Sequence, residues 1–312
     1  MSRSAAASQT AEPGSLNLGF SPLEPAHRVV LEPFLRRWPH PLSGYTFGSL
    51  LAWNRLFRFQ WAFTRSGALV FSLVLDDGQR HLMQPVGPLD EADGRELLEA
   101  AGSLDYPLQV VAVDRQFVES HPWFVERCRV ENDRACANYL YLADDLAALA
   151  GRRYSSKRNL IAQAARSYQW TVEPLGQAAV PVAQELLSLL EADHPGPSEW
   201  QRRDTVALKS ALELVGDLGQ EGLLVRVDGQ PAALTLFEAR PPDTLEIHFE
   251  RALRRYKGLH QIVNRLGGQV ARERGLTYVN REEDLGDPGL RQSKLSYHPA
   301  RLVSAFRLWV VR

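Results

Sequence analysis

The sequence contains little cysteine, little lysine and no long apolar run. Only Cys128 and Cys136 occur in 312 residues, which excludes a disulfide framework and fits a reducing compartment. No stretch approaches the roughly 18 consecutive apolar residues of a bilayer-spanning helix. Residues 1–20 lack the apolar segment of a signal peptide and are expected to form a disordered tail. These absences predict a soluble, cytoplasmic protein without a transmembrane segment.

Metal and covalent catalysis are also disfavoured. The eight histidines show no His-x-x-x-His spacing, and the two cysteines form no paired motif, so no metal site is expected. No Gly-x-Ser-x-Gly segment occurs, and neither cysteine lies in a known nucleophile motif. We therefore expect no metal and no tightly bound cofactor.

Charge is unevenly distributed along the chain. Residues 1–145 carry 13 Lys or Arg against 18 Asp or Glu, whereas residues 146–312 carry 23 against 19. An anionic ligand is therefore expected in the second half. Of the 36 basic residues, only Lys157, Lys209, Lys257 and Lys294 are lysines. Three of these four lie within the motifs described below.

The second half has a clear pattern of alternating strands and periodic helices. Strands are expected at 170–175, 222–230, 231–240, 244–252, 276–282 and 300–311, and helices at 180–193, 202–219, 259–274 and 288–297. Asp228-Gly229 indicates a hairpin turn between two of the strands. The order is β, α, α, β, β, β, α, β, α, β.

The first half repeats the later part of this order. Strands are expected at 59–67, 68–78, 80–88 and 108–114, helices at 91–102 and 115–123, and a hairpin over 128–143, all after a helical region at 26–57. Two copies of one α/β unit explain this pattern most simply. We expect domains at 21–143 and 144–312, with "DDLAALAGRRYSSKRNLIAQAARSY" at their junction.

The strand at 244–252, "TLEIHFERA", carries ionisable residues on one face. Alternation places Leu245, Ile247 and Phe249 on the core face and Glu246, His248 and Glu250 on the other. Three side chains that can move protons would then lie together in the middle of a sheet. A strand whose polar face meets solvent would show the same pattern.

Positive charges follow this strand and precede a helix. Arg251, Arg254, Arg255 and Lys257 come before Gly258, and the first amides of the helix have no internal partner. Such a turn is suited to bind an anion, because backbone donors, cations and a glycine coincide. A solvated charge cluster is the alternative. The corresponding helix of the first half begins with acidic residues, 90–93, so the first copy is expected to lack a donor site.

The sequence resembles the GNAT superfamily of N-acyltransferases in a tandem arrangement. The segment "RRYKGLH" falls where the family's pyrophosphate loop lies. The segments "GRRYSSKRN", "EIHFE" and "YVNREEDLGDPGLRQSKLSYHP" are similar to an uncharacterised bacterial family related to the C-terminal domain of phosphatidylglycerol lysyltransferases. This resemblance covers the chain from Gly44 onward. It implies two GNAT-like domains of the α/β (α+β) type, each with a mixed, mostly antiparallel sheet flanked by helices.

The resemblance implies an activated donor held between splayed fourth and fifth strands. The donor is acyl-CoA in GNAT enzymes and an aminoacyl-tRNA ester in the lysyltransferase branch. His260 stands where acyl-CoA binding favours Gly or Ala, and Gln292 stands where a tyrosine often protonates the thiolate. Glutamine cannot act as an acid. Both departures favour aminoacyl-tRNA over acyl-CoA as co-substrate.

The candidate site residues fall into four groups. Glu250 or His248 is the expected general base, with Glu246 on the same strand face. The expected donor-binding residues are Arg254, Arg255, Lys257, Gly258 and His260. Residues that could line the acceptor cleft are Asn280, Arg281, Glu282, Glu283, Lys294 and Tyr297, although an acidic helix start and a core tyrosine are alternatives. Tyr154, Lys157 and Arg158 could track tRNA or an anionic head group, or form an ordinary surface helix.

The predicted function is transfer of an acyl or aminoacyl group to an amine or hydroxyl. The acceptor is expected to be a small molecule or a lipid head group, and tRNA is the expected macromolecular partner. An acyl-CoA-dependent N-acetyltransferase is one alternative. A non-catalytic tandem GNAT module that binds a ligand is the other, and the sequence does not predict an oligomeric state.

Overall fold

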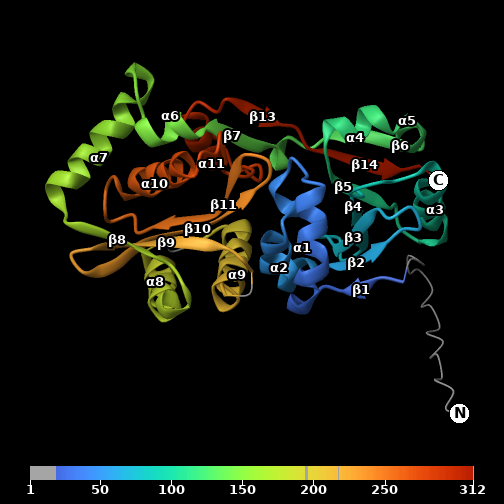
Figure 1. Cartoon of the computed structure of the whole chain (residues 1–312), viewed down its shortest axis with the longest axis horizontal. Coiled ribbons are helices and arrows are strands. Elements are labelled where there is room, and N and C mark those ends of the chain that lie inside the picture. Colours follow the sequence, from blue (N-terminus) through green and yellow to red (C-terminus); the bar gives the residue numbers. More distant parts are fainter. Residues whose placement is uncertain (1–18, 194–195, 217, 312) are drawn as a thin grey trace, which may run out of the picture.

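Two mixed sheets form the two lobes of the molecule (Figure 1). The structure is a computed structural model, and it describes residues 19–193, 196–216 and 218–311. One sheet has the order β1 (Ser21–Pro22), β2 (Gln60–Phe63), β3 (Leu69–Val74), β4 (Arg80–Met83), β5 (Gln109–Val113), β14 (Phe306–Val310) and β6 (Cys128–Asn132). The other has the order β13 (Arg301–Val303), β7 (Asn138–Leu142), β12 (Tyr278–Asn280), β11 (Thr244–Ala252), β10 (Gln230–Arg240), β9 (Glu221–Val227) and β8 (Trp170–Pro174).

Helices flank both sheets. They are α1 (Arg28–Arg37), α2 (Phe47–Phe57), α3 (Glu91–Ala100), α4 (Arg115–Ser120), α5 (Pro122–Val125), α6 (Ala143–Ala148), α7 (Ser155–Ser167), α8 (Val180–Asp193), α9 (Glu199–Glu213), α10 (Leu259–Glu273) and α11 (Pro288–Leu295). Short 3-10 turns include η2 (Ser43–Tyr45) and η4 (Arg134–Cys136). In Figure 1, α10 and α11 cover one side of the left-hand sheet and α8 and α9 the other. None of the helices in the described ranges is long and apolar enough to cross a membrane.

The predicted fold class is confirmed. Each sheet has one parallel pair, β4 with β5 and β11 with β12, and its other pairs are antiparallel. The elements expected in the second half occur in the predicted order, and α10 ends beside Gly275 as its glycine indicates. The tail predicted at 1–20 lies outside the described residues except for its last two.

The hairpin predicted over 128–143 is wrong. Strand β6 pairs with β14, whereas β7 pairs with β12 and β13 in the other sheet. Between them the chain crosses from one lobe to the other, and the amide of Asp133 donates to the carbonyl of Ala305, where the chain crosses back. The single closing strand expected at 300–311 is likewise divided between the sheets. Each half of the chain therefore contributes a strand to the sheet of the other half, and residue 143 does not separate the two sheets.

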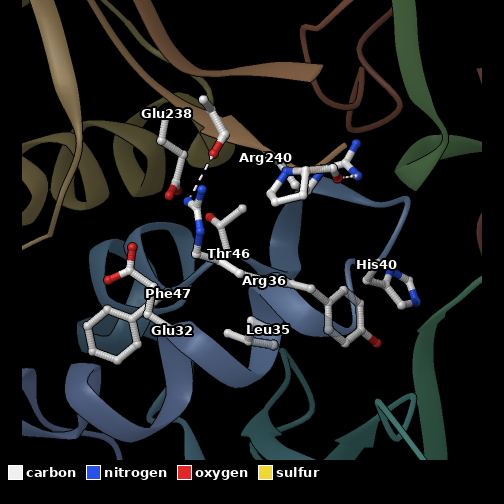
Figure 2. A pocket seen from close by; sticks show the side chains of 11 residues that line it. Glu32, Leu35, Arg36, His40, Thr46, Phe47, Glu238 and Arg240 are labelled. Atoms are coloured by element: carbon white, nitrogen blue, oxygen red, sulfur yellow. Dashed lines mark hydrogen bonds between the residues drawn. The ribbon is translucent and has the colours of Figure 1, made fainter. Parts of the chain in front are cut away.

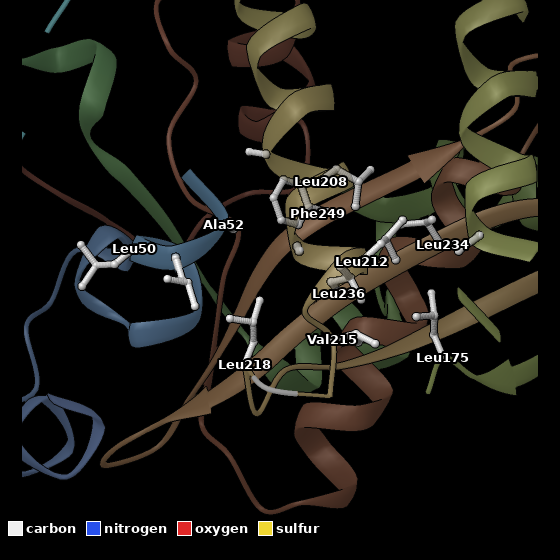
Figure 3. Packing of buried hydrophobic residues seen from close by; sticks show 14 of the residues in the cluster. Leu50, Ala52, Leu175, Leu208, Leu212, Val215, Leu218, Leu234, Leu236 and Phe249 are labelled. Atoms are coloured by element: carbon white, nitrogen blue, oxygen red, sulfur yellow. The ribbon is translucent and has the colours of Figure 1, made fainter. Parts of the chain in front are cut away.

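A continuous apolar core joins the lobes. Leu50 of α2 belongs to the same buried cluster as Leu208 and Leu212 of α9 and Leu236 of β10 (Figure 3). Fully burying one such side chain contributes about 1.5–3 kcal/mol. Groups at the boundary between the lobes are therefore held on a common scaffold.

Candidate functional site

A β-bulge in β11 positions the central histidine. Leu236 of β10 pairs with Phe249, but Phe237 pairs with Ile247, so His248 is an extra residue without a partner. Because one residue is inserted, each side chain after His248 lies on the face of the sheet opposite to the one that regular alternation predicts. Phe249 accordingly lies in the core beside α9 (Figure 3), whereas Ile247 lies in the cluster on the α10 side. The prediction that Phe249 shares a face with Ile247 is therefore wrong.

Strands β11 and β12 run parallel and then diverge. They pair only from Thr244 with Tyr278 to Glu246 with Asn280. Ile247 and residues 249–252 of β11 pair with β10 on one side, and none of residues 247–252 pairs with a described strand on the β12 side. The resemblance to GNAT enzymes implies such splayed strands at the donor site.

Arg281 spans the gap between the diverging strands. Its Nε and Nη2 donate to Oε2 of Glu250 at 2.9 and 2.6 Å, and its guanidinium lies 5.1 Å from the ring centroid of Tyr297. Burial alone would lower the pKa of Arg281, but Glu250 and the neighbouring tyrosines raise it above its ordinary value. Glu250 is thus held in an ion pair, and the alternative that it faces open solvent does not apply.

His248 lies between two carboxylates. Its Nε2 is 2.7 Å from Oε1 of Glu238, and its Nδ1 is 2.9 Å from Oε1 of Glu282. Burial alone would lower the pKa of His248, but these two carboxylates raise it to about 10. At neutral pH the side chain is therefore a buried imidazolium with no free site for a further proton.

Glu246 is the deepest of the three strand residues. It is fully buried and pairs with Arg240. Burial raises its pKa, and the charge of Arg240 opposes that rise. Because it is fully buried, Glu246 does not face an open site in which it could take a proton from a ligand.

The loop after β12 is held by asparagine side chains. Oδ1 of Asn280 accepts from the amide of Glu282 at 2.9 Å, where the backbone has a left-handed φ of 56°. Nδ2 of Asn280 donates to Oδ1 of Asn138 at 2.9 Å, and the same oxygen accepts from the amide of Ser43 at 2.8 Å. The loop is therefore fixed to β7 and, through Ser43, to the first lobe.

Glu283 differs from the other carboxylates of the site. In the described part of the chain it forms no ion pair, and its Oε2 accepts only from Nδ2 of Asn138, at 3.3 Å. Burial, followed by the charge of Glu282, raises its pKa to about 7. Lys294 is buried nearby, its Nζ donates to the carbonyls of Arg281 and Glu283, and burial lowers its pKa to about 8. Glu283 is therefore a carboxyl group that can exchange a proton near neutral pH.

The predicted donor loop is only partly open. Gly258 has a φ of 93°, and a Cβ added there would lie 2.3 Å from the carbonyl oxygen of Leu160 in α7. Helix α7 thus closes this side of the glycine. Arg251 is paired with Asp204, but Arg254, Arg255, Lys257 and His260 have exposed side chains.

The three junction residues have different environments. Tyr154 is fully buried and donates to the carbonyl of Tyr297 at 3.0 Å, so its ring cannot stack on a base. Arg158 donates to the carbonyls of Leu149 and Gly151 and closes the end of α6. Lys157 lies at the site: its Nζ donates to Ser296 Oγ at 2.7 Å and lies 4.3 Å from the ring centroid of Tyr297.

A pocket lies between the lobes, next to Glu238 (Figure 2). Its walls come from α1, η2, α2 and the end of β10. They include Arg36, His40, Thr46, Glu238 and Arg240. Because Glu238 lines this pocket and also binds His248, the buried network connects the pocket with the loop after β12.

Several site residues escaped sequence reasoning. They are Ser43, Asn138, Glu238 and Arg240, and most come from segments distant in sequence from the motifs. One signal was present: the hairpin between the strands at 231–240 and 244–252 places Glu238 opposite Glu246. Within the described ranges, no group of three or more His, Cys, Asp or Glu side chains could hold a metal ion.

Comparison with solved structures gives the fold class of the whole chain. A tandem GNAT protein from the clavulanic acid biosynthesis pathway aligns with a TM-score of 0.50 at 12% identity, covering 94% of this chain and 98% of that one. L-PGS from Bacillus licheniformis aligns with a TM-score of 0.62 at 15% identity, covering 89% and 90%. The protein has a tandem GNAT fold.

A match of the sequence to a family model identifies the family. The chain belongs to the family described as phosphatidylglycerol lysyltransferase, C-terminal, whose model matches residues 35–308. A protein of unknown function from Bacteroides thetaiotaomicron VPI-5482 is 28% identical and aligns with a TM-score of 0.85, covering 94% of this chain and 99% of that one. No curated protein matches the sequence significantly.

Proposed function

We propose that this protein transfers an aminoacyl group from an aminoacyl-tRNA ester to a hydroxyl or amine of an acceptor, with a lipid head group as the preferred acceptor. The family match over residues 35–308 supports the reaction class. The observation that carries the proposal is the divergence of β11 and β12 after Glu246 and Asn280. Backbone donors along the unpaired edge of β11 would stabilise the oxyanion that forms when the ester carbonyl is attacked.

The proton chemistry of the site favours Glu283 as the base. The acceptor O–H or N–H group attacks the ester carbonyl carbon, and its proton passes to Glu283. The bond to the ribose oxygen breaks, and the proton goes to that oxygen as the tRNA leaves. A base works best when its pKa is near the working pH, and the pKa of Glu283 is about 7. His248, already protonated, holds Glu238 and Glu282 in place.

The surroundings of the donor loop favour tRNA over acyl-CoA. The carbonyl of Leu160 occupies one side of Gly258, which limits the approach of a pyrophosphate to the backbone there. The cations extend beyond this loop: Arg254, Arg255 and Lys257 are exposed on it, and Lys157 is half-buried on α7, where its Nζ donates to Ser296 Oγ. A surface of this kind suits an extended phosphate backbone.

The test compares donors directly. The purified chain is incubated with radiolabelled aminoacyl-tRNA and phosphatidylglycerol vesicles, and in parallel with radiolabelled acetyl-CoA and a panel of amines. We expect label from the tRNA to appear in the lipid fraction. Transfer from acetyl-CoA alone would instead indicate an N-acetyltransferase, and donor binding without any turnover would indicate a non-catalytic module.

A charge reversal tests the basic surface. Lys157→Glu should raise KM for aminoacyl-tRNA about tenfold, since it removes a cation beside Tyr297 and adds a repelling charge. Lys209→Glu is the matched control, because Lys209 lies on α9 and pairs with Glu191. Equal KM values in the two variants would show that the donor does not bind along α7.

A further inference from the structure

Helix α1 carries an exposed apolar stripe on its outer face. Val29 and Val30 are 80% and 49% exposed, and Trp38, just after the helix, is 40% exposed. Pro33 and Arg37 are exposed on the same side. Their spacing, i, i+1, i+4 and i+8, follows one face of an α-helix. The opposite face, with Leu31 and Leu35, is buried in the core.

The exposed charge beside this stripe is basic at its C-terminal end, where Arg36 and Arg37 lie, whereas Glu24 is exposed ahead of the helix. Between Pro25 and Pro39, the exposed charged side chains are Arg36 and Arg37. Glu32, the acidic residue of this segment, is half-buried and paired with Arg28. This local surface is basic, although residues 1–145 as a whole carry more acidic than basic side chains.

We propose that this face of α1 docks on the surface of an anionic lipid bilayer. A helix that lies in the membrane interface has an apolar stripe flanked by arginines, with an aromatic side chain at the level of the head groups. Val29, Val30 and Pro33 supply the apolar area, and Arg36 and Arg37 match the negative lipid surface. Trp38, with the guanidinium of Arg37 5.9 Å from its ring centroid, supplies the aromatic group.

The position of α1 gives this docking a consequence for the site. The same helix lines the pocket between the lobes with Glu32, Leu35 and Arg36 (Figure 2). A bilayer on the outer face of α1 would therefore lie beside the mouth of the pocket that Glu238 connects to His248. The docking itself needs no donor and no chemistry, so it can be tested independently of the proposed transfer reaction.

The test is co-sedimentation of the whole chain with vesicles of phosphatidylcholine alone and of phosphatidylcholine with phosphatidylglycerol at about 7:3. We expect the protein to sediment with the anionic vesicles, and less so as salt rises, because screening weakens the attraction. Val29→Ser/Val30→Ser should reduce the bound fraction at least fivefold. Arg37→Gln should reduce binding to anionic vesicles and leave the weak binding to neutral vesicles unchanged.

The matched control is Val206→Ser, because Val206 is an exposed valine on a helix of the other lobe, α9. It should sediment as the wild type does, and circular dichroism should show equal folding of all variants. Binding by the Val29→Ser/Val30→Ser protein equal to wild type would overturn the proposal. An absence of vesicle binding would also overturn it if the wild type self-associates and the double substitution abolishes this self-association. The stripe would then contact a second copy of the chain. Vesicle binding without aminoacyl transfer would contradict only the proposed function.

Discussion

Glu250 and Arg281 form a two-hydrogen-bond ion pair across the gap between β11 and β12. Their side chains are only 17% and 12% exposed. Removing one partner of a buried pair leaves the other charge uncompensated, which costs about 3–5 kcal/mol. We therefore predict that Glu250→Gln lowers the free energy of unfolding by about 3 kcal/mol in urea denaturation. Glu250→Gln/Arg281→Met should recover most of this loss, and failure to do so would contradict the pairing.

The imidazolium of His248 predicts a stability that declines at alkaline pH. Its pKa is about 10 in the folded protein against an ordinary value of 6.5. The native state therefore binds the extra proton, so its stabilisation is complete below pH 6.5 and is lost as the pH rises through 10. Between pH 7.5 and 9 the free energy of unfolding should fall by about 1.4 kcal/mol per pH unit from this group.

His248→Gln should remove this pH-dependent loss, measured by urea denaturation at several pH values. Glu282→Gln keeps the histidine but removes one carboxylate, so it should move the decline to lower pH. A wild-type slope equal to that of His248→Gln would show that the histidine is neutral in the folded protein.

Sequence patterns predicted the elements better than their partners. Alternation and turn residues such as Asp228-Gly229 are local, and they located β9, β10 and β11 correctly. The exchange of β7 and β14 depends on contacts between segments far apart in the chain, which no local pattern encodes. Each of these strands has the composition that suits either sheet.

The candidate site shows the same limit at the level of single residues. The alternation in "TLEIHFERA" is regular, and no glycine marks the bulge at His248 that separates Ile247 from Phe249. Residues 280–283 were expected to line an acceptor cleft because they follow a strand at its carboxyl end, where open α/β sheets place ligands, and in the structure Glu282 contacts His248. Which carboxylates are paired with arginine depends on β10, α10 and β12 together, and this determines which one can act as a base.

The pH dependence of transfer should identify the base. If Glu283 accepts the proton, kcat/KM should rise with a slope of one in log units up to about pH 7 and then level, because the carboxylate form is required. Glu283→Gln should reduce the rate by 10²–10⁴-fold and abolish this rise of kcat/KM with pH. Glu250→Gln, assayed at a temperature where it is folded, should retain the rise. A rise that persists in Glu283→Gln would assign the base to another group.

The close contact between α10 and α7 predicts unequal costs for two glycine substitutions at the ends of α10. Gly275 and Gly258 both have positive φ, 70° and 93°, but a Cβ at Gly275 would meet nothing within 4 Å, whereas at Gly258 it would meet Leu160 O at 2.3 Å. Gly275→Ala should lower the free energy of unfolding by only about 1–2 kcal/mol, the cost of a left-handed backbone in a residue with a Cβ. Gly258→Ala should cost more and should also raise KM for the tRNA donor, because α7 must move away and carries Lys157 with it. Equal unfolding free energies for the two variants would show that α7 does not pack on the start of α10.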